Sequence, residues 1–287
     1  HRDLHSFPTR RSSDLDLAQF KLLDGEMLFT ARLNLGNCQF TSNSWVLSPL
    51  GPGFPLFGDL DNDGDEDFGV LAYGNGPLPS YSGWLRNDGS TNTLLPGIEF
   101  PLANLTCSLA DYDNDGRLDV AATGGTSGYD NVFQLFHNNG GFSFTTNTPN
   151  IEGTQYAVMA WGDADGDGDL DLLLSGIPNP PYPGNPFIRL YRNDTPVTNA
   201  QPQTPTNLIA TVSGSSVQLS WAAVTDANQS GGLSYNVRVG RAGQGVDVIT
   251  PAANLVTGKL LLPQVGNAGH GLFRVLTNLL AATYYWS

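Results

Sequence analysis

Residues 162–176 read GDADGDGDLDLLLSG, and this stretch decides the fold. Aspartates occupy alternate positions from Asp163 to Asp171, and the apolar run Leu172–Leu174 follows directly. Carboxylates this close together repel one another and resist removal from water, so the loop needs a neutralising partner. The pattern therefore indicates a cation-binding turn that leads into a packed strand.

The same acidic pattern occurs three times at a constant spacing. It starts at Asp59, Asp111 and Asp163, so successive copies are 52 residues apart. A fixed period of this length is typical of solenoids, propellers or arrays. Apolar segments flank each copy and Asn-Asp or Asn-Asn turn signals follow, which predicts about four short strands per repeat. A helical solenoid is disfavoured because these segments lack a 3.6-residue periodicity.

The composition is typical of a globular chain of short strands and tight turns. The 287 residues include 34 Gly and 19 Pro, and 14% are charged. A formal net charge of −14 argues against nucleic acid as a partner, because nucleic-acid-binding proteins carry basic faces. Fifteen of the 27 acidic residues lie in the three loops, so the acidity is local. No apolar run approaches the roughly 18 residues that a transmembrane segment needs.

Each acidic loop offers four carboxylates at the same positions. Counted from the first aspartate, they stand at positions 1, 3, 5 and 9, and glycine stands at position 6. Side chains at positions 1, 3 and 5 of a tight loop can converge on one centre, and glycine permits the sharp turn. Such all-oxygen sites suit hard cations, and a flexible site suits Ca²⁺ better than Mg²⁺. The loops are not EF-hands, because position 12 is Val70, Ala122 or Leu174 rather than glutamate.

The pattern D-x-D-x-D-G-x-x-D between two strands resembles the FG-GAP/VCBS repeats of integrin-α-type β-propellers. Phe57-Gly58 retains the dipeptide that names the family, Trp161-Gly162 is a looser version, and the second repeat has Leu109-Ala110 instead. The resemblance covers residues 46–195 and implies three blades, each with one Ca²⁺ site. It implies side-chain ligands at positions 1, 3, 5 and 9 and a backbone carbonyl at position 7: Asp59, Asp61, Asp63, Asp65 and Asp67 in the first site, Asp111, Asp113, Asp115, Arg117 and Asp119 in the second, and Asp163, Asp165, Asp167, Asp169 and Asp171 in the third.

Two alternatives concern the loops themselves. They could be solvated acidic turns that bind nothing specific, but three copies in register with a shared glycine disfavour this. Bound calcium could also regulate the protein rather than rigidify it. The loops are short and internal to each repeat, which favours the structural role.

The first 45 residues hold two different segments. Residues 1–15, HRDLHSFPTRRSSDL, resemble the conceptual translation of a short-read sequencing adapter and are excluded from fold reasoning. Residues 16–45 are predicted to be the remnant of a preceding blade, because Asp16-Leu17-Ala18 lies one period before Asp67-Phe68-Gly69. On this prediction the adapter replaces that blade's calcium loop, Asp14 is not a ligand, and the total number of blades stays open.

The last third of the chain predicts a second domain. Residues 196–204 read as a linker, and residues 205–287 resemble a fibronectin type III domain that ends within strand F. Trp221 is predicted in its core, and Leu279-x-x-x-Thr283-x-Tyr285 looks like that family's tyrosine corner. The predicted fold class is therefore all-β: a partial β-propeller of about three and a half four-stranded blades plus an incomplete immunoglobulin-like fibronectin type III sandwich.

Nothing in the sequence predicts an enzyme. The carboxylate clusters lie one per repeat rather than in one cleft, and no nucleophile, phosphate-loop or zinc-site motif is present. His137 takes the place that Arg86 and Arg192 have in the other repeats, so it is interpreted as a blade-surface residue. Cys38 and Cys107 are too few for a disulfide framework, and two separate thiols are favoured.

Two functions from different classes are compatible with this reading. The first is a non-catalytic, calcium-binding region of a secreted or cell-surface protein that serves adhesion or binds a protein or carbohydrate. The alternative is the accessory region of a larger secreted enzyme, for example a polysaccharide-degrading one. Both place the chain outside the cell, because weak carboxylate sites for calcium fill at extracellular calcium levels.

Overall fold

A computed structural model describes the chain at residues 17–23, 26–32, 34–36, 39–40, 43–46, 53–72, 81–88, 92–98, 102–126, 130–178, 185–197, 202–226, 232–256 and 265–287. Contacts divide these residues into two compact units, one within Asp16–Asn199 and one within Ala200–Ser287. The predicted adapter segment, Cys38 and most of the proline-rich loop 176–186 lie outside the described residues.

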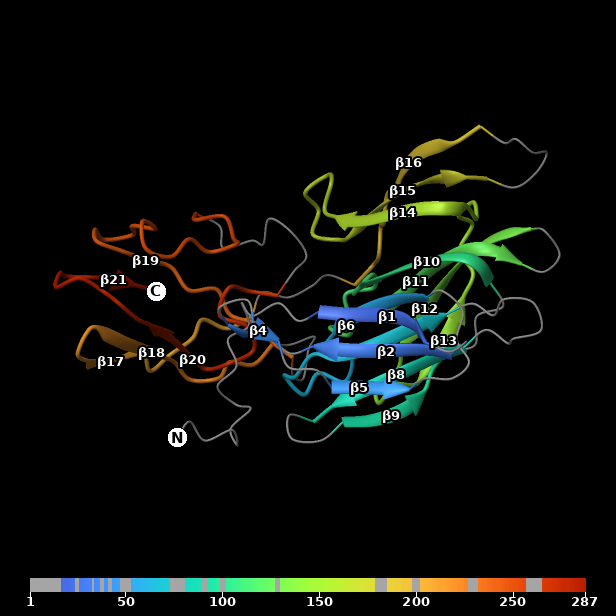
Figure 1. The fold of residues 1–287 in the computed structure, drawn as a ribbon. Helices are drawn as coiled ribbons and strands as arrows, with labels where there is room; N and C mark the ends of the chain where they lie inside the picture. The colour runs from blue at the N-terminus through green and yellow to red at the C-terminus, as the bar shows by residue number, and fades with distance from the viewer. Residues whose placement is uncertain are drawn as a thin grey trace. The chain divides into compact units, whose positions relative to one another are not determined.

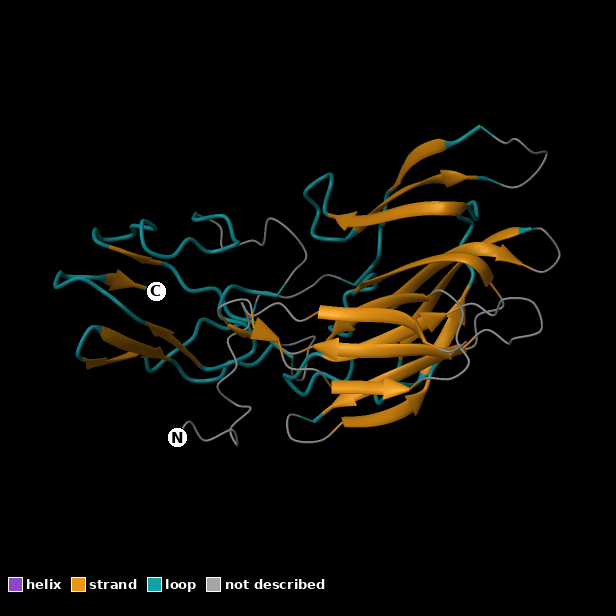
Figure 2. Ribbon diagram, viewed as in Figure 1, coloured by secondary structure: helices purple, strands orange, loops and turns teal. Residues whose placement is uncertain are grey.

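The described residues form strands, turns and loops, with no helix (Figure 2). Every strand pair is antiparallel and no sheet closes into a barrel, so the prediction of an all-β chain is confirmed. A search of the same residues for a membrane-crossing helix finds no candidate. The strands of the first unit, labelled in Figure 1, are β1 (Leu17–Leu23), β2 (Glu26–Arg32), β3 (Asn34–Gly36), β4 (Gln39–Phe40), β5 (Asn43–Val46), β6 (Gly53–Gly58), β7 (Asp67–Ala72), β8 (Tyr81–Asn87), β9 (Asn92–Pro96), β10 (Leu102–Ala110), β11 (Asp119–Thr126), β12 (Asn131–Asn138), β13 (Phe144–Asn147), β14 (Gln155–Gly162), β15 (Asp171–Ile177) and β16 (Phe187–Tyr191).

Each of the three sequence repeats forms its own antiparallel sheet. The first gives the order β6-β7-β8-β9, the second β10-β11-β12-β13, and the third β14-β15-β16. Neighbours in the sheet are also neighbours in the chain, so each repeat is an antiparallel meander. The strands β1, β2 and β5, from the predicted blade remnant, form a further three-stranded antiparallel sheet.

The acidic loops connect the first two strands of each repeat in one shared register. Gly58 pairs with Asp67, Ala110 with Asp119 and Gly162 with Asp171. The first strand therefore ends immediately before position 1 of the loop, and the second strand begins at position 9. The 52-residue period thus corresponds to one hairpin per repeat, with the loop at its tip.

Apolar faces of successive repeats pack against each other. One cluster joins Leu56 and Trp84 of the first repeat to Val120, Ala122 and Phe136 of the second. A second cluster joins residues of the second and third repeats, namely Ala121, Phe133, Leu135, Leu172 and Leu174. Because the second repeat is covered on both sides, β11 is buried along almost its whole length.

The three leucines after the third loop alternate between the packed face and the other face of their strand. Leu172 and Leu174 are 2% and 0% exposed, whereas Leu173 points to the other face and is 43% exposed. Alternation along a strand sends neighbouring side chains to opposite faces of a sheet. Two of the three leucines therefore enter the packed cluster, each contributing about 2 kcal/mol by its burial.

The second unit contains two small sheets with their own core. Its strands are β17 (Ile209–Ser213), β18 (Ser216–Ser220), β19 (Val239–Gly240), β20 (Phe273–Leu276) and β21 (Tyr285–Trp286), in the orders β17-β18-β20 and β19-β21. Trp221 is 6% exposed and packs in this core, as predicted.

The sequence predicts Tyr285 as the corner tyrosine, but Tyr284 is the residue that faces the core. The hydroxyl of Tyr284 donates a hydrogen bond to the carbonyl of Leu280 at 3.0 Å, and Tyr284 packs against the core. Tyr285 is 49% exposed. Side chains alternate along the strand, so only one of two adjacent tyrosines can face inward, and that residue is Tyr284.

Candidate metal centres

In the first two loops the aspartate at position 1 organises the turn. The Asp59 carboxylate accepts hydrogen bonds from the backbone N–H groups of Asp63 and Gly64, both at 3.0 Å. Asp111 accepts the equivalent bonds from Asp115 and Gly116 at 3.1 and 2.9 Å. Short polar side chains commonly stabilise turns in this way. The carboxylate at position 1 is therefore held facing the loop interior.

Two positions of each loop adopt the left-handed backbone conformation. At position 6, Gly64, Gly116 and Gly168 have φ values of 97°, 84° and 109°, which explains the shared glycine. At position 4, Asn62 and Asn114 both have φ of 59°, and the third loop has a glycine there. Asparagine is among the few residues that tolerate this region, so the alternation of Asn and Gly follows from the backbone.

The structure brings carboxylates of each loop close enough to share an ion. Ligand atoms lie within 4.8 Å of one another in each of these groups: Asp59, Asp61 and Asp67; Asp111, Asp113 and Asp115; Asp163, Asp165 and Asp171. Asp63 and Asp167, at position 5 of the first and third loops, lie outside these groups. Any of the three clusters could hold a metal ion.

The aspartate at position 9 is the most buried of the loop carboxylates in each repeat, and in the second repeat it groups with Asp113 and His137 rather than with Asp111. Asp67, Asp119 and Asp171 are 0%, 1% and 1% exposed. One oxygen of each accepts the backbone N–H of position 2, from Leu60 at 2.9 Å, Tyr112 at 3.3 Å and Ala164 at 2.8 Å. The other oxygen accepts the backbone N–H of an asparagine at or just after the end of the third strand: Asn87 at 2.9 Å, Asn138 at 2.7 Å and Asn193 at 2.9 Å.

Burial makes several of these carboxylates difficult to ionise. Loss of water around the group raises the pKa of Asp67 to about 7, against the opposing effect of two backbone N–H groups. The same cause raises the pKa of Asp119 to about 8 and that of Asp111 to about 6. A bound cation would favour the ionised forms of these groups.

Among the carboxylate oxygens of the described residues, two buried atoms have no hydrogen-bond partner, and both belong to position 3. They are Oδ1 of Asp61 and Oδ1 of Asp113. An unsatisfied buried oxygen is costly, so such an atom in a carboxylate cluster fits a metal ligand. The residues present therefore fit a bound cation.

Residues 111–174 match the FG-GAP-like repeat. The match begins at the first aspartate of the second loop and ends in β15, so it contains two of the three clusters. A search of curated proteins gives no match, and neither does a search of solved structures. An FG-GAP-like repeat suggests a binding region of the β-propeller type.

Asparagines that were not predicted as functional residues connect the second and third repeats to the one before each. The side chain of Asn138, 0% exposed, donates to the carbonyls of Leu60 at 2.8 Å and Leu118 at 3.0 Å. Asn193 donates likewise to Tyr112 at 2.6 Å and Leu170 at 3.3 Å. One acceptor lies at position 8 of the same repeat and the other at position 2 of the preceding loop.

A second pair of asparagines connects the loops directly. Asn62 donates to the carbonyl of Gly116 at 2.8 Å, and Asn114 donates to the carboxylate of Asp169 at 2.8 Å. These residues occupy position 4 of the first and second loops, and each reaches into the next loop. The available sequence signal is the asparagine at position 4 of the first two loops, from which no contact was predicted.

Two residues at the second loop, His137 and Arg117, differ in chemical type from their equivalents in the other repeats. His137, interpreted from the sequence as a surface residue, lies against the loop, with Nδ1 3.0 Å from Oδ2 of Asp113. Its side chain is 27% exposed, so it is partly accessible at the surface and also contacts the acidic loop. Arg117, at position 7, pairs with Asp115 and donates from Nε to the carbonyl of Asn138 at 2.6 Å.

Proposed function

We propose that the three loops each bind one Ca²⁺ ion that fixes the shape of the hairpin. The observation that carries this proposal is the buried aspartate at position 9, which recurs in the same register in all three repeats and lies close to the carboxylate at position 3 in each. Buried carboxylates without a cation repel one another and are poorly solvated. A divalent ion would remove both costs.

The donor set favours calcium over magnesium. The first and third clusters consist of carboxylate oxygens, and the backbone carbonyls predicted at position 7 would add another oxygen. Ca²⁺ accepts six to eight oxygen ligands in irregular geometry, whereas Mg²⁺ demands a near-ideal octahedron. A hairpin loop places its oxygen ligands in an irregular arrangement, so it suits Ca²⁺ better than Mg²⁺.

We further propose that the repeat sheets are blades of a β-propeller. Support comes from antiparallel meanders at a 52-residue period, two of four strands and one of three, and from the apolar clusters that join successive sheets. For the second unit, we propose a sandwich of the fibronectin type III kind. Its pairings β17-β18-β20 and β19-β21 correspond to strands A-B-E and C-F of that fold.

The function we propose is a non-catalytic, calcium-stabilised binding region of a secreted or cell-surface protein, serving adhesion or recognition of a protein or carbohydrate. Weak carboxylate sites fill at extracellular calcium concentrations, which supports placement outside the cell. In propeller folds the recognition residues lie in surface loops, so the metal would support the site rather than contact the ligand.

Calorimetric titration of the full chain with Ca²⁺ tests the proposal. We expect three bound ions, and loss of one ion in each of the variants Asp61→Asn, Asp113→Asn and Asp165→Asn. Position 3 is chosen because these side chains are only partly buried or exposed, so the variants should fold. Asp247→Asn, in the second unit, is the matched control and should still bind three. Absence of binding, or stoichiometry unaffected by the three variants, would overturn the assignment.

A further inference from the structure

The second repeat differs from the other two at one position near the end of the third strand. That position carries Arg86 in the first repeat, His137 in the second and Arg192 in the third. Arg192 lies with Nε 3.2 Å from the Asp165 carboxylate, and Arg86 pairs with Asp88 at 2.9 Å. An arginine cannot donate a lone pair to a metal, whereas a neutral imidazole can.

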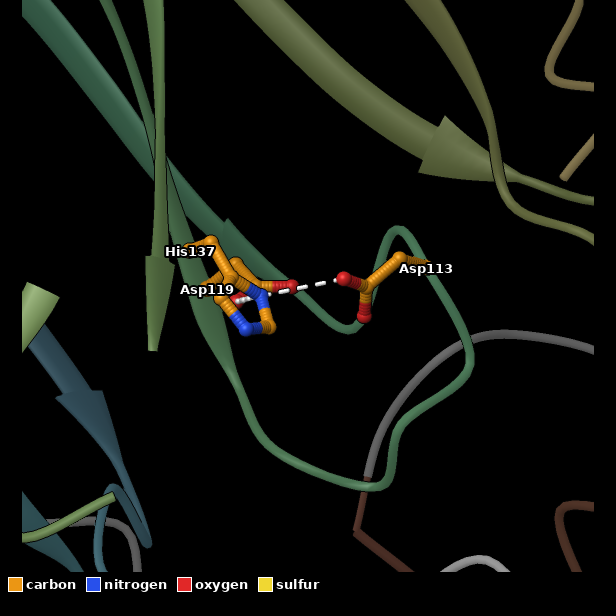
Figure 3. A group of neighbouring side chains, drawn as sticks. All are labelled: Asp113, Asp119 and His137. Carbon is orange, nitrogen blue, oxygen red and sulfur yellow. Dashed lines mark ion pairs between the residues drawn. The ribbon is translucent and has the colours of Figure 1, made fainter. Parts of the chain in front are cut away.

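His137 is placed as a ligand would be. Its Nδ1 lies 3.0 Å from Oδ2 of Asp113 and 3.5 Å from Oδ1 of Asp119, and the three residues form a potential metal-binding group (Figure 3). Figure 3 shows the imidazole beside Asp119 and facing Asp113 across the loop. The three side chains come from β12, the start of β11 and the loop.

The contact between His137 and Asp113 has the length of an ion pair, but two buried atoms of these side chains form no hydrogen bond. Nδ1 of His137 and Oδ1 of Asp113 are both buried atoms without a hydrogen-bond partner. Donors bound to one ion at bond lengths of about 2.0–2.2 Å lie about 2.8–3.6 Å apart for tetrahedral or octahedral angles. The two distances from Nδ1 fall within this range.

The second loop is also a weaker calcium site than its neighbours. The guanidinium of Arg117 pairs with Asp115, so the carboxylate at position 5 already has a cation. At position 7 the first and third loops carry Asp65 and Asp169, whereas the second carries this arginine. The affinity of a calcium loop depends on its ligand charge, which here is reduced.

We propose that, where both ions are present, the second site prefers a divalent transition-metal ion of the zinc class, held by Asp113, Asp119 and His137, to the calcium that it binds otherwise, while the first and third sites keep calcium. This inference rests on the proposed function, because it names the ion of one of those three sites. Imidazole nitrogen with two carboxylates is a common donor set for zinc, whereas calcium takes oxygen ligands. The single histidine therefore converts one copy of a repeated site to a different metal preference.

Metal analysis by mass spectrometry, after equilibrium dialysis of the full chain against Ca²⁺ with trace Zn²⁺, tests this inference. The wild-type chain should retain two calcium ions and one zinc ion. His137→Arg, which installs the residue of the other two repeats, should bind zinc at least about 100-fold more weakly. His137→Gln should lose zinc in the same way without adding a charge, which separates loss of a ligand from repulsion.

A spectroscopic measurement on the same proteins identifies the ligand. Co²⁺ in place of zinc should give a visible d–d absorption band in the wild type that disappears in both His137 variants and persists in the control His270→Gln. Three calcium ions and no zinc in the wild type would overturn this inference and leave the proposed function intact. Zinc retained by the His137 variants would also overturn it. A chain that binds neither metal would overturn both.

Discussion

At the scale of single residues, the aspartate at position 9 combines two roles. It is nearly inaccessible to water, and its two oxygens already accept backbone N–H groups from the loop and from the third strand. These bonds hold Asp67 and its equivalents in place without neutralising their charge. The stability of the apo protein should therefore depend on the ionisation of Asp67 and Asp119, whose pKa values burial raises.

We expect the chain in excess chelator to lose stability as the pH rises from about 4 to about 8. The folded-state pKa values of about 7 for Asp67 and about 8 for Asp119 exceed the ordinary value of 3.8. Between these limits the folded state holds protons that the unfolded chain has released, so a rise in pH favours unfolding. The stabilisation is complete below about pH 4 and lost above about pH 8. Thermal melts across this range should show it, and excess calcium should abolish or reverse the slope.

Asn138 offers a residue-scale test of the connection between repeats. Replacing it with alanine removes the donors to the buried carbonyls of Leu60 and Leu118, which should lower the free energy of unfolding by about 2–3 kcal/mol. The neighbouring Asn139 donates to Thr145 on an exposed surface, so Asn139→Ala should cost about 0.5 kcal/mol or less. Urea denaturation measures both, and equal effects would contradict the role given to Asn138.

At the scale of strands, cross-strand pairs vary in size while the register stays the same. Gly69 pairs with Trp84 in the first repeat, Ala121 with Leu135 in the second and Leu173 with Leu190 in the third. A methyl group on Gly69 would lie 2.2 Å from the ring of Trp84, which is 0% exposed. The glycine in β7 is therefore required by its large partner and not by backbone geometry.

We expect Gly69→Ala to destabilise the first unit by about 1–3 kcal/mol, because the added methyl group overpacks the core. The double variant Gly69→Ala, Trp84→Leu recreates the pair found in the second repeat. It should lose less stability than the sum of the losses of the two single variants. The smaller side chain at position 84 makes room for the added methyl group, and the methyl group fills part of the space that the tryptophan leaves. Denaturation of the four proteins of this cycle measures the coupling, and strict additivity would contradict it.

The hairpins could be predicted from sequence because their determinants are local. Alternating aspartates, a glycine at position 6 and flanking apolar strands all lie within about fifteen residues of Asp59, Asp111 or Asp163. Contacts between repeats were missed because they join a side chain to a backbone carbonyl far away in sequence. The bond from Asn193 to the carbonyl of Tyr112 leaves no mark at Tyr112, since every residue has a carbonyl. The contact of His137 with Asp113 was not predicted, because packing brings a position on the surface of a strand against the acidic loop.

At the scale of the whole molecule, all candidate metal groups among the described residues belong to the first unit. The second unit has its own core, built around Trp221 and Val237, and offers no such cluster in its described part. Metal binding and the folding of the two units should therefore be separable.

Hydrogen exchange read by mass spectrometry should show this separation. Removing calcium should speed exchange in peptides from β6 to β16 and leave peptides from β17 to β21 unchanged. A ligand that binds only the folded state adds about 1.4 kcal/mol per site when its free concentration is ten times Kd. Three sites would therefore slow exchange in the first unit strongly. Acceleration in both units, or in neither, would contradict the assignment.

The asparagine contacts have a consequence for how such a chain can arise. The partner of Asn138 is the carbonyl of Leu60, and that of Asn193 is the carbonyl of Tyr112, so the side chain at position 2 is irrelevant to the joint. Any copy of the repeat can follow any other and still find its acceptor. A gene that duplicates or deletes one unit need not change the neighbouring units to keep this joint, which makes the number of units an easy quantity for evolution to alter.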